Sequence, residues 1–338
     1  MTAPKPRVLI ASYAFWPSLG GLEIIAEQLA RGLNARGHVV EVLTATPAPE
    51  AQVERSDLPY PVLRSPGLWA SLMAFRRADI VISKHLALRT CWPILLIRRP
   101  LIIWHATWYP EERRLNRYLR KAIMHRARNI GNSAAIGASL DHCDGMVHPG
   151  YDDSRFRNEV PWSERDMDFA YIGRLGAEKG VDLLIEAVAE LPGTTLSIIG
   201  SGSLEPQLRE RVEALEISDR VHFLGRMEAK EINAALNRHK VMVAPSRYDE
   251  PFGTVALEGQ AAGCRVVVSS GGGFPEAAGP GGIVFTNGDI DALRDAMQQA
   301  LEPMDSRLSG DIDRHLESHR IQSFVAAFSD MITAAMRR

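Results

Sequence analysis

The sequence has few cysteines and no long apolar run. Three cysteines occur in 338 residues, far apart, without a Cys-x-x-Cys pair or a His/Cys cluster of zinc-site spacing. A disulfide framework and a zinc site are therefore not expected, and sparse cysteine is typical of a reducing compartment, so we expect a cytoplasmic protein. No segment approaches the roughly 20 apolar residues of a transmembrane helix. The short polar N-terminus does not resemble a signal peptide, and we expect none.

The sequence also lacks a large net charge, but its charges are unevenly distributed. The formal net charge is −2, whereas residues 61–130 carry 14 Lys/Arg against 3 Asp/Glu and residues 131–338 carry 20 against 32. The basic segment predicts an anionic partner. It lacks the interleaved aromatic residues of single-stranded nucleic-acid binders, so we expect no nucleic-acid partner. A G-x-G-x-x-G loop is missing after the first apolar run, which argues against an NAD enzyme.

Helical and strand patterns alternate along the whole chain. Short apolar runs without alternation are typical of buried parallel strands, and each is followed by a helix-like segment. In the first half we expect strands at 7–13, 39–44, 80–82, 101–104 and 129–131 and helices at 22–36 and 111–128. In the second half we expect strands at 168–173, 195–199, 220–224, 240–244 and 265–268 and a final helix at 318–338. This order favours parallel sheets with helices on both faces.

A polar stretch, residues 151–166, separates the two series and reads as a linker. We therefore predict an α/β protein with two Rossmann-like parallel-sheet domains, 1–155 and 160–317, that face each other across a cleft. The helix at 318–338 is expected to pack back toward the first domain. Ligands of such sheets bind at the carboxyl ends of the strands.

The segment from Pro245 to Gly259 carries the clearest chemistry. Glu250 lies in a loop, the proline after it opens a helix expected at about 252–262, and Glu258 lies within that helix. Free N–H groups at the helix start, those of Phe252, Gly253 and Thr254, would attract phosphate. Carboxylates on either side can accept paired hydrogen bonds from vicinal hydroxyls. The pattern therefore fits a diphosphate with a hydroxyl-rich group on either side.

This segment resembles the E-x7-E motif of the retaining glycosyltransferases of family 4, which have the two-domain GT-B fold. The resemblance extends over nearly the whole chain. It implies that Glu258 binds the nucleotide ribose, that Glu250 contacts the donor sugar, and that the backbone of residues 252–254 faces the sugar and phosphates. It also implies an acceptor-side N-terminal domain and a C-terminal domain that binds the nucleotide sugar.

A second element, Tyr171 to Gly180, resembles the G-R-L…K-G element of the same family. A strand ends at Gly173, and Arg174 and Lys179 follow at its carboxyl end. Two cations there would neutralise a leaving diphosphate without a metal. We therefore expect no metal and no cofactor, and a nucleoside-diphosphate sugar of UDP or GDP type as donor.

The resemblance adds further site residues. His105 follows a predicted strand and resembles the active-site histidine of the family, which lies against the donor sugar. With Glu250, Arg174 and Lys179 it forms the predicted catalytic set. The predicted binding residues are Gly20 and Gly21 of an N-terminal glycine loop, Gly173, Gly200 and Ser201 near the nucleotide, Arg226 and Met227 at the base, and Phe252, Gly253, Thr254 and Glu258.

We therefore expect a retaining glycosyltransferase that acts on an acceptor hydroxyl, a saccharide or lipid-linked saccharide, in bacterial cell-surface polysaccharide, lipopolysaccharide or glycolipid synthesis. The alternatives are a GT-B epimerase or phosphorylase, and a catalytically silent partner subunit. The basic helix at 111–128 has an apolar stripe, so it could contact the inner face of the plasma membrane through anionic lipid. The alternative for this helix is packing on its sheet with a solvated basic face.

Overall fold

The computed structural model describes residues 5–16, 21–48, 58–110, 113–303 and 305–337. The chain divides into two compact units. Unit 1 comprises residues 1–150 and 321–338, and unit 2 comprises residues 151–320. The unit boundaries therefore fall at 150/151 and 320/321, beside the predicted ends at 155 and 317.

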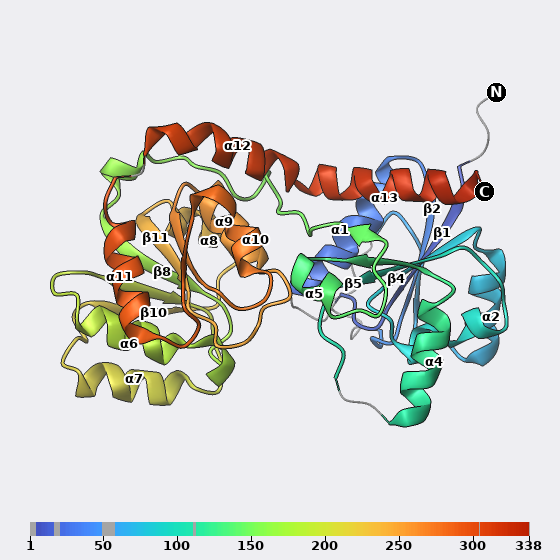
Figure 1. The fold of residues 1–338 in the computed structure, drawn as a ribbon, viewed down its shortest axis with the longest axis horizontal. Coiled ribbons are helices and arrows are strands. Elements are labelled where there is room, and N and C mark those ends of the chain that lie inside the picture. Colours follow the sequence, from blue (N-terminus) through green and yellow to red (C-terminus); the bar gives the residue numbers. More distant parts are fainter. Residues whose placement is uncertain (1–4, 17–20, 49–57, 111–112, 304, 338) are drawn as a thin grey trace. The chain divides into compact units, whose positions relative to one another are not determined.

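Unit 1 is built on a parallel sheet whose seven described strands have the order β3-β2-β1-β4-β5-β6-β7 (Figure 1). The strands are β1 (Arg7–Ser12), β2 (Val39–Thr44), β3 (Val62–Arg64), β4 (Ile80–Lys84), β5 (Leu101–His105), β6 (Arg128–Gly131) and β7 (Gly145–Met146). The helices are α1 (Gly21–Ala35), α2 (Leu68–Arg77), α3 (Leu88–Cys91), η2 (Trp92–Leu95), α4 (Arg114–Met124), α5 (Ala134–Ala138) and α13 (Ile321–Met336).

Alternate residues of each strand face opposite helical layers of unit 1, as the two-residue repeat of a strand requires. Val8 and Ile10 belong to the core under α1 and α13, whereas Leu9 and Ala11 belong to the core under α2 and α3. Trp104 of β5 is 1% exposed and contacts Phe324 of α13, with ring centroids 5.1 Å apart. The last helix of the chain therefore completes the core of unit 1.

Unit 2 repeats the arrangement with a parallel sheet of six described strands in the order β10-β9-β8-β11-β12-β13 (Figure 1). The strands are β8 (Met167–Ile172), β9 (Leu196–Ile199), β10 (Val221–Gly225), β11 (His239–Ala244), β12 (Arg265–Ser269) and β13 (Gly282–Phe285). The helices are η3 (Trp162–Glu164), η4 (Ala177–Lys179), α6 (Val181–Ala189), α7 (Glu205–Ala214), α8 (Ala229–Leu236), α9 (Thr254–Ala261), α10 (Phe274–Ala278), η5 (Gly279–Gly281), α11 (Ile290–Ala300), η6 (Ser306–Leu308) and α12 (Ser309–Ser318). Helices α6, α7 and α11 cover one face, and α8, α9 and α10 cover the other.

The predicted fold class, two Rossmann-like parallel-sheet domains, is confirmed, and three details are corrected. The predicted helix at 111–128 is shorter, because after Met124 the turns Arg126 N–H to Ile123 C=O and Ala127 N–H to Met124 C=O replace helical bonds. The helix expected from about 252 begins at Thr254. The helix expected at 318–338 begins at Ile321, since Ser318 is the last residue of the preceding helix α12 and residues 319 and 320 are not helical.

Candidate donor site

The strand order of unit 2 reverses between β8 and β11. From β8 the chain proceeds outward through β9 and β10, and it then returns to pair β11 with the other edge of β8. Loops that leave adjacent strands at such a reversal diverge and open a crevice where ligands bind. The loop after β8 carries Arg174 and Lys179, and the loop after β11 carries Glu250. Lys179 and Glu250, 71 residues apart in sequence, therefore meet at the carboxyl ends of the strands.

Lys179 and Glu250 form an ion pair at this edge. Lys179 Nζ lies 2.5 Å from Glu250 Oε1, and the Ser246 hydroxyl donates to the same oxygen at 3.0 Å. Both charged side chains are largely shielded from solvent, with 23% and 13% of the side-chain surface exposed. A shielded, hydrogen-bonded pair holds both groups in fixed positions, because separating them would leave a charge without a partner in a weakly hydrated site.

Backbone contacts join the two loops. The carbonyl of Glu178 accepts hydrogen bonds from the N–H groups of Arg247 at 2.9 Å and Tyr248 at 3.1 Å. Gly180 lies between η4 and α6 with φ +66°, and a Cβ there would come within 2.1 Å of the Pro245 carbonyl oxygen. Only glycine permits this approach, which brings Lys179 to Glu250.

Arg174 has a different partner from Lys179. Its guanidinium lies 2.7 Å from Glu178 Oε1, with 72% of the side chain exposed, and the Tyr171 hydroxyl donates to the Arg174 carbonyl at 2.8 Å. Both predicted diphosphate-binding cations are thus paired with carboxylates. The two pairs differ in exposure, and the exposed arginine is the one that can change partners at little cost.

The predicted nucleotide-binding residues gather at the ends of adjacent strands. Gly173, Gly200 and Arg226 directly follow β8, β9 and β10. A Cβ at Gly200, whose φ is +141°, would lie 1.8 Å from the Gly173 carbonyl oxygen. The backbones of Gly173 and Gly200 thus pack closely and carry no side chains at these strand ends. A ligand can therefore approach the backbone closely there. Ser201 is exposed beside Gly200, and Met227 is half-buried after the exposed Arg226.

The N-terminus of α9 is the predicted phosphate site. Gly253 precedes the helix with φ +98° and has no side chain with which to cap it, and Thr254 is its first residue. Uncapped N–H groups and the helix dipole favour an anion there. Phe252 is 2% exposed and its side chain belongs to the core of unit 2, so only its backbone is placed to meet a ligand.

Glu258 lies in the second turn of α9. Part of its side chain reaches solvent, but its carboxyl group lies among protein atoms. Burial, reinforced by the negative charge of Asp152, raises the pKa of Glu258 to about 7, with Arg155 acting in the opposite direction. This carboxyl group therefore gains a proton easily in a site where no described residue donates a hydrogen bond to it.

His105 is fully buried at the end of β5 in unit 1, and both ring nitrogens have partners there. Nδ1 lies 2.8 Å from the Tyr109 hydroxyl and Nε2 lies 3.0 Å from Asn129 Oδ1. The Asn129 amide group donates to the Met124 carbonyl, so its oxygen accepts from His105 and Nε2 carries the proton. Burial lowers the pKa of His105 to about 4. The ring is therefore neutral, and both of its nitrogens are engaged within unit 1 in this arrangement, while its predicted place against the donor sugar stays a prediction.

His85, a residue not predicted from the sequence, lies beside this cluster after β4. Its ring stacks on Tyr109 with centroids 4.2 Å apart, and its backbone has φ +54°, which is unusual for a residue other than glycine. Burial lowers the pKa of His85 to about 3, and the neighbouring His105, once it is protonated, acts in the same direction. Its Nδ1 is buried and has no hydrogen-bond partner among the described residues.

Several features of the site fall outside the sequence prediction or outside the described residues. Gly20 lies outside the described residues, and Gly21 is the first residue of α1. Ser246, Tyr109 and Asn129 were not predicted; each is a polar residue near a strand, which is too weak a signal by itself. Within the described ranges, no group of three or more His, Cys, Asp or Glu could hold a metal ion, and no helix is long and apolar enough to cross a membrane.

Family models match both halves of the chain. The model of the group 1 glycosyl transferases matches residues 152–309, and that of glycosyltransferase family 4 matches residues 19–155. Glycogen synthase of Mycobacterium tuberculosis is 38% identical over 141 residues, which are 40% of this chain and 34% of the relative. D-inositol 3-phosphate glycosyltransferase of Mycolicibacterium smegmatis is 32% identical over 205 residues, 54% and 46% of the two chains. The chain thus covers less than half the length of these curated relatives.

Solved structures resemble the chain over almost its whole length. A glycosyltransferase from Rickettsia africae aligns with a TM-score of 0.79 at 14% identity and covers 99% of both chains. An Anabaena protein solved in complex with UDP and glucose aligns with a TM-score of 0.77 at 18% identity, covering 97% of this chain and 99% of the other. The two family models and the two parallel-sheet units together show that the chain belongs to the family 4 glycosyltransferases with the GT-B fold.

Proposed function

We propose that the protein transfers a hexose-like unit from a nucleoside-diphosphate sugar, of UDP or GDP type, to an acceptor hydroxyl with retention of configuration and without a metal. The observation that carries the proposal is the Lys179–Glu250 ion pair at the strand-order reversal of unit 2, followed in sequence by the uncapped N-terminus of α9 and by Glu258. Cations, helix N–H groups and carboxylates are the groups that a diphosphate between two hydroxylated moieties needs.

Each group has a distinct part in the proposed reaction. Glu258 accepts hydrogen bonds from the ribose hydroxyls, and Glu250, fixed by Lys179 and Ser246, accepts them from the donor sugar. The bond between the anomeric carbon and the phosphate oxygen breaks while the bond to the acceptor oxygen forms, and the acceptor proton passes to the departing diphosphate on the same face. Arg174 and Lys179 stabilise the negative charge that develops on the diphosphate.

Relatives support the donor type and a role in polysaccharide or glycolipid synthesis. A Corynebacterium glutamicum relative, 33% identical over 162 residues, is named a GDP-mannose-dependent monoacylated alpha-(1-6)-phosphatidylinositol monomannoside mannosyltransferase. Others are named for glycogen and for D-inositol 3-phosphate, and the Anabaena structure contains UDP. We therefore propose a place in bacterial cell-surface polysaccharide, lipopolysaccharide or glycolipid synthesis, with a saccharide or lipid-linked saccharide acceptor.

Nucleotide binding and donor turnover in EDTA test the donor site. Glu258→Ala should weaken binding of the preferred nucleoside diphosphate by roughly 10- to 100-fold, because paired hydrogen bonds to the ribose are lost. Arg174→Ala should mainly lower turnover of the nucleotide sugar, by roughly 10- to 1,000-fold. Arg209→Ala, which removes an exposed α7 residue paired with Glu205, is the control. If both site variants behave like this control, the site assignment is wrong.

We also propose that α4 contacts anionic membrane lipid. Leu115 and Tyr118 lie one turn apart on α4 and are 67% and 71% exposed, and Arg114 and Arg117 beside them are exposed as well. Among the residues of α4 only Ile123 is buried. The N-terminal part of α4 thus presents Leu115 and Tyr118 to solvent, whereas its C-terminal part packs on unit 1 through the buried Ile123. The exposed apolar pair among arginines favours lipid contact by this part of the helix.

Cosedimentation with phosphatidylglycerol vesicles at low salt tests this contact. The protein should pellet with these vesicles but not with phosphatidylcholine vesicles, and the double variant Leu115→Ser/Tyr118→Ser should stay in the supernatant. Leu68→Ser/Trp69→Ser is a matched control, since both residues of α2 are 73% exposed in the same unit. Failure of the unmodified protein to pellet, or equal loss in the two variants, would refute a contact through α4.

A further inference from the structure

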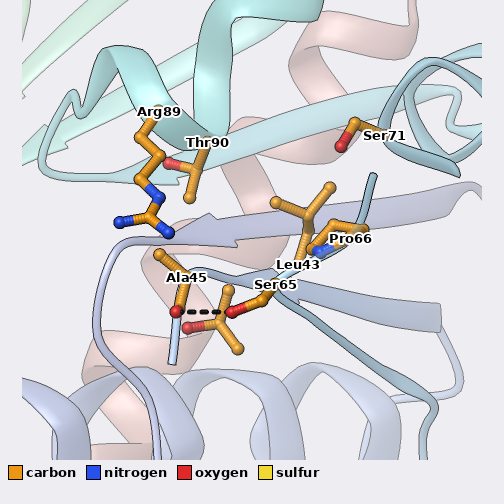
Figure 2. A pocket seen from close by; sticks show the side chains of 8 residues that line it. Leu43, Ala45, Ser65, Pro66, Ser71, Arg89 and Thr90 are labelled. Carbon is orange, nitrogen blue, oxygen red and sulfur yellow. Dashed lines mark hydrogen bonds between the residues drawn. The ribbon is translucent and has the colours of Figure 1, made fainter. Parts of the chain in front are cut away.

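Unit 1 contains a small polar pocket that the donor site does not explain. It has a volume of about 80 Å³ and lies where β2 ends, between the segment after β3 and the start of α3. Figure 2 shows Arg89 and Thr90 on one side, Ala45 and Ser65 opposite them, and Leu43 and Pro66 beside these. The lining residues are Leu43, Thr44, Ala45, Ser65, Pro66, Ser71, Arg89 and Thr90.

Three hydroxyl groups of the pocket donate their protons to backbone carbonyl groups. Ser65 Oγ donates to the Ala45 carbonyl at 2.8 Å, Ser71 Oγ donates to the Gly67 carbonyl at 3.0 Å, and Thr90 Oγ1 donates to the Ala87 carbonyl at 3.2 Å. A hydroxyl that donates to the backbone keeps its lone pairs. These three side chains are therefore acceptors toward the pocket, and they suit a ligand with hydroxyl groups of its own.

Arg89 is the cation of this pocket. Its guanidinium points across the opening toward Ala45 (Figure 2). No described residue forms an ion pair or a side-chain hydrogen bond with it, whereas Arg64 in the same unit donates to the Trp16 carbonyl at 2.6 Å. A guanidinium offers paired donors in a plane, the geometry that a carboxylate or phosphate accepts.

Ser65 is held in place at a conformational cost. Its φ is +40°, a region that residues other than glycine seldom occupy. Two hydrogen bonds maintain it, from Ser65 N–H to the Thr44 carbonyl at 2.8 Å and from its hydroxyl to Ala45. Such strain persists where the surrounding structure fixes the residue, and it tends to occur at ligand sites. The wall of the pocket opposite Arg89 is therefore preformed.

We propose that this pocket is an acceptor subsite that binds an acidic, hydroxyl-bearing group, either the phosphate of a sugar or polyol phosphate or the carboxylate of an acidic sugar. This inference rests on the proposed glycosyltransferase function. Arg89 binds the anion, and the hydroxyl oxygens of Ser65, Ser71 and Thr90 accept hydrogen bonds from the neighbouring ligand hydroxyls.

The size and charge of the pocket support this class of ligand. Whole-ligand pockets measure roughly 300–1,000 Å³, so a volume of about 80 Å³ admits one acidic group and its nearest atoms rather than a nucleotide. Arg89 also lies within the segment 61–130, which carries 14 Lys/Arg against 3 Asp/Glu. The positive electrostatic potential of this segment attracts an anionic acceptor to unit 1.

Titrations followed by thermal shift at low ionic strength test the subsite, with inorganic phosphate, glucose 6-phosphate, glucuronate and neutral glucose as probes. Binding of glucose 6-phosphate or glucuronate should be at least about tenfold weaker in Arg89→Ala, because the paired contact is lost. Arg98→Ala is the matched control, an exposed arginine of the same basic segment. Lys179→Ala controls for anion binding at the donor site of unit 2.

The outcomes separate this proposal from the proposed function. Loss in Arg89→Ala alone supports the subsite, and preference for glucose 6-phosphate or for glucuronate identifies the acidic group. Equal weakening in Arg89→Ala and Arg98→Ala would mean general charge attraction and would overturn it, as would loss only in Lys179→Ala or equal binding of neutral glucose. If the protein binds no nucleotide sugar, the proposed function fails, and the pocket is then no acceptor subsite. The titrations still show whether Arg89 binds an acidic group.

Discussion

At the scale of single residues, the proposed contact of Glu258 with the ribose couples nucleotide binding to protonation. Burial and the charge of Asp152 raise the pKa of its carboxyl group to about 7, well above the value of 4.5 for a free side chain. Below pH 7 the empty site therefore holds a proton there. Ribose hydroxyls that donate to the carboxylate favour its charged form, so a bound nucleotide lowers this pKa.

This linkage predicts that nucleotide binding releases up to one proton between about pH 4.5 and 7 and almost none at pH 8. Affinity should therefore rise with pH up to about 7 and then level off. Calorimetry of the intact nucleotide sugar, whose diphosphate diester does not titrate near pH 6, in two buffers of different ionisation enthalpy at pH 6 measures the proton released by the protein. Glu258→Gln should abolish the release, and a proton release that persists in this variant would contradict the assignment.

His105 shows what the sequence cannot reveal at this scale. Its position at the end of a strand was predicted correctly as a structural feature, since strand ends follow from the apolar pattern. The environment of its ring depends on Tyr109 and on Asn129, 24 residues away, and on the hydrogen bonds that orient that amide. Tertiary packing sets such contacts, so no local sequence pattern predicts them.

At the scale of elements, α9 begins as it does because of Gly253. The residue has φ +98°, and a Cβ there would lie 2.1 Å from the Phe274 ring. The glycine therefore lets the chain turn from the loop of Glu250 into the helix while Phe252 stays buried. The sequence predicted a helix after the proline but placed its start too early, because helix propensity does not report a left-handed residue at the start.

Gly253→Ala should consequently reduce stability by about 2–4 kcal/mol, from backbone strain together with overpacking. Gly193→Ala isolates the backbone part, since Gly193 has φ +77° and no atom within 4 Å of an added Cβ, and it should cost only about 1 kcal/mol. Chemical denaturation of the three proteins measures the difference. Equal losses in the two variants would show that the contact with Phe274 has no energetic role.

Element order was the most predictable property of the chain. The strands of both sheets follow from short apolar runs such as 39–44 and 265–268, which the structure reproduces within a residue. The short edge strands β3, β7 and β13 were not predicted, because partly exposed edge positions carry no continuous apolar signal. Pairing of Lys179 with Glu250 required the strand order, which a single sequence does not contain.

At the scale of the whole molecule, helix α13 packs in unit 1 together with the N-terminal half of the chain. Phe328 of α13 is fully buried and packs edge-on against Trp104 of β5, with ring centroids 6.2 Å apart. Residues 321–338 therefore belong to unit 1, although they follow unit 2 in the sequence.

Phe328→Ala should destabilise unit 1 by about 3–5 kcal/mol and leave unit 2 little changed. Leu184→Ala, at a fully buried position of α6, should do the reverse, by about 2–5 kcal/mol. Differential scanning calorimetry distinguishes the two transitions. Equal displacement of both transitions by either variant would show that the units unfold as one and would contradict the division.

The central claim is a metal-independent nucleotide-sugar site in unit 2, and a thermal-shift screen of UDP- and GDP-hexoses in EDTA tests it most directly. A ligand at 100 times its dissociation constant contributes about 2.7 kcal/mol. We expect one nucleotide class to give such a shift in EDTA and to lose it in Glu258→Ala and Lys179→Ala. If no nucleotide sugar shifts the unmodified protein, or if the shift requires a divalent metal, the account is wrong.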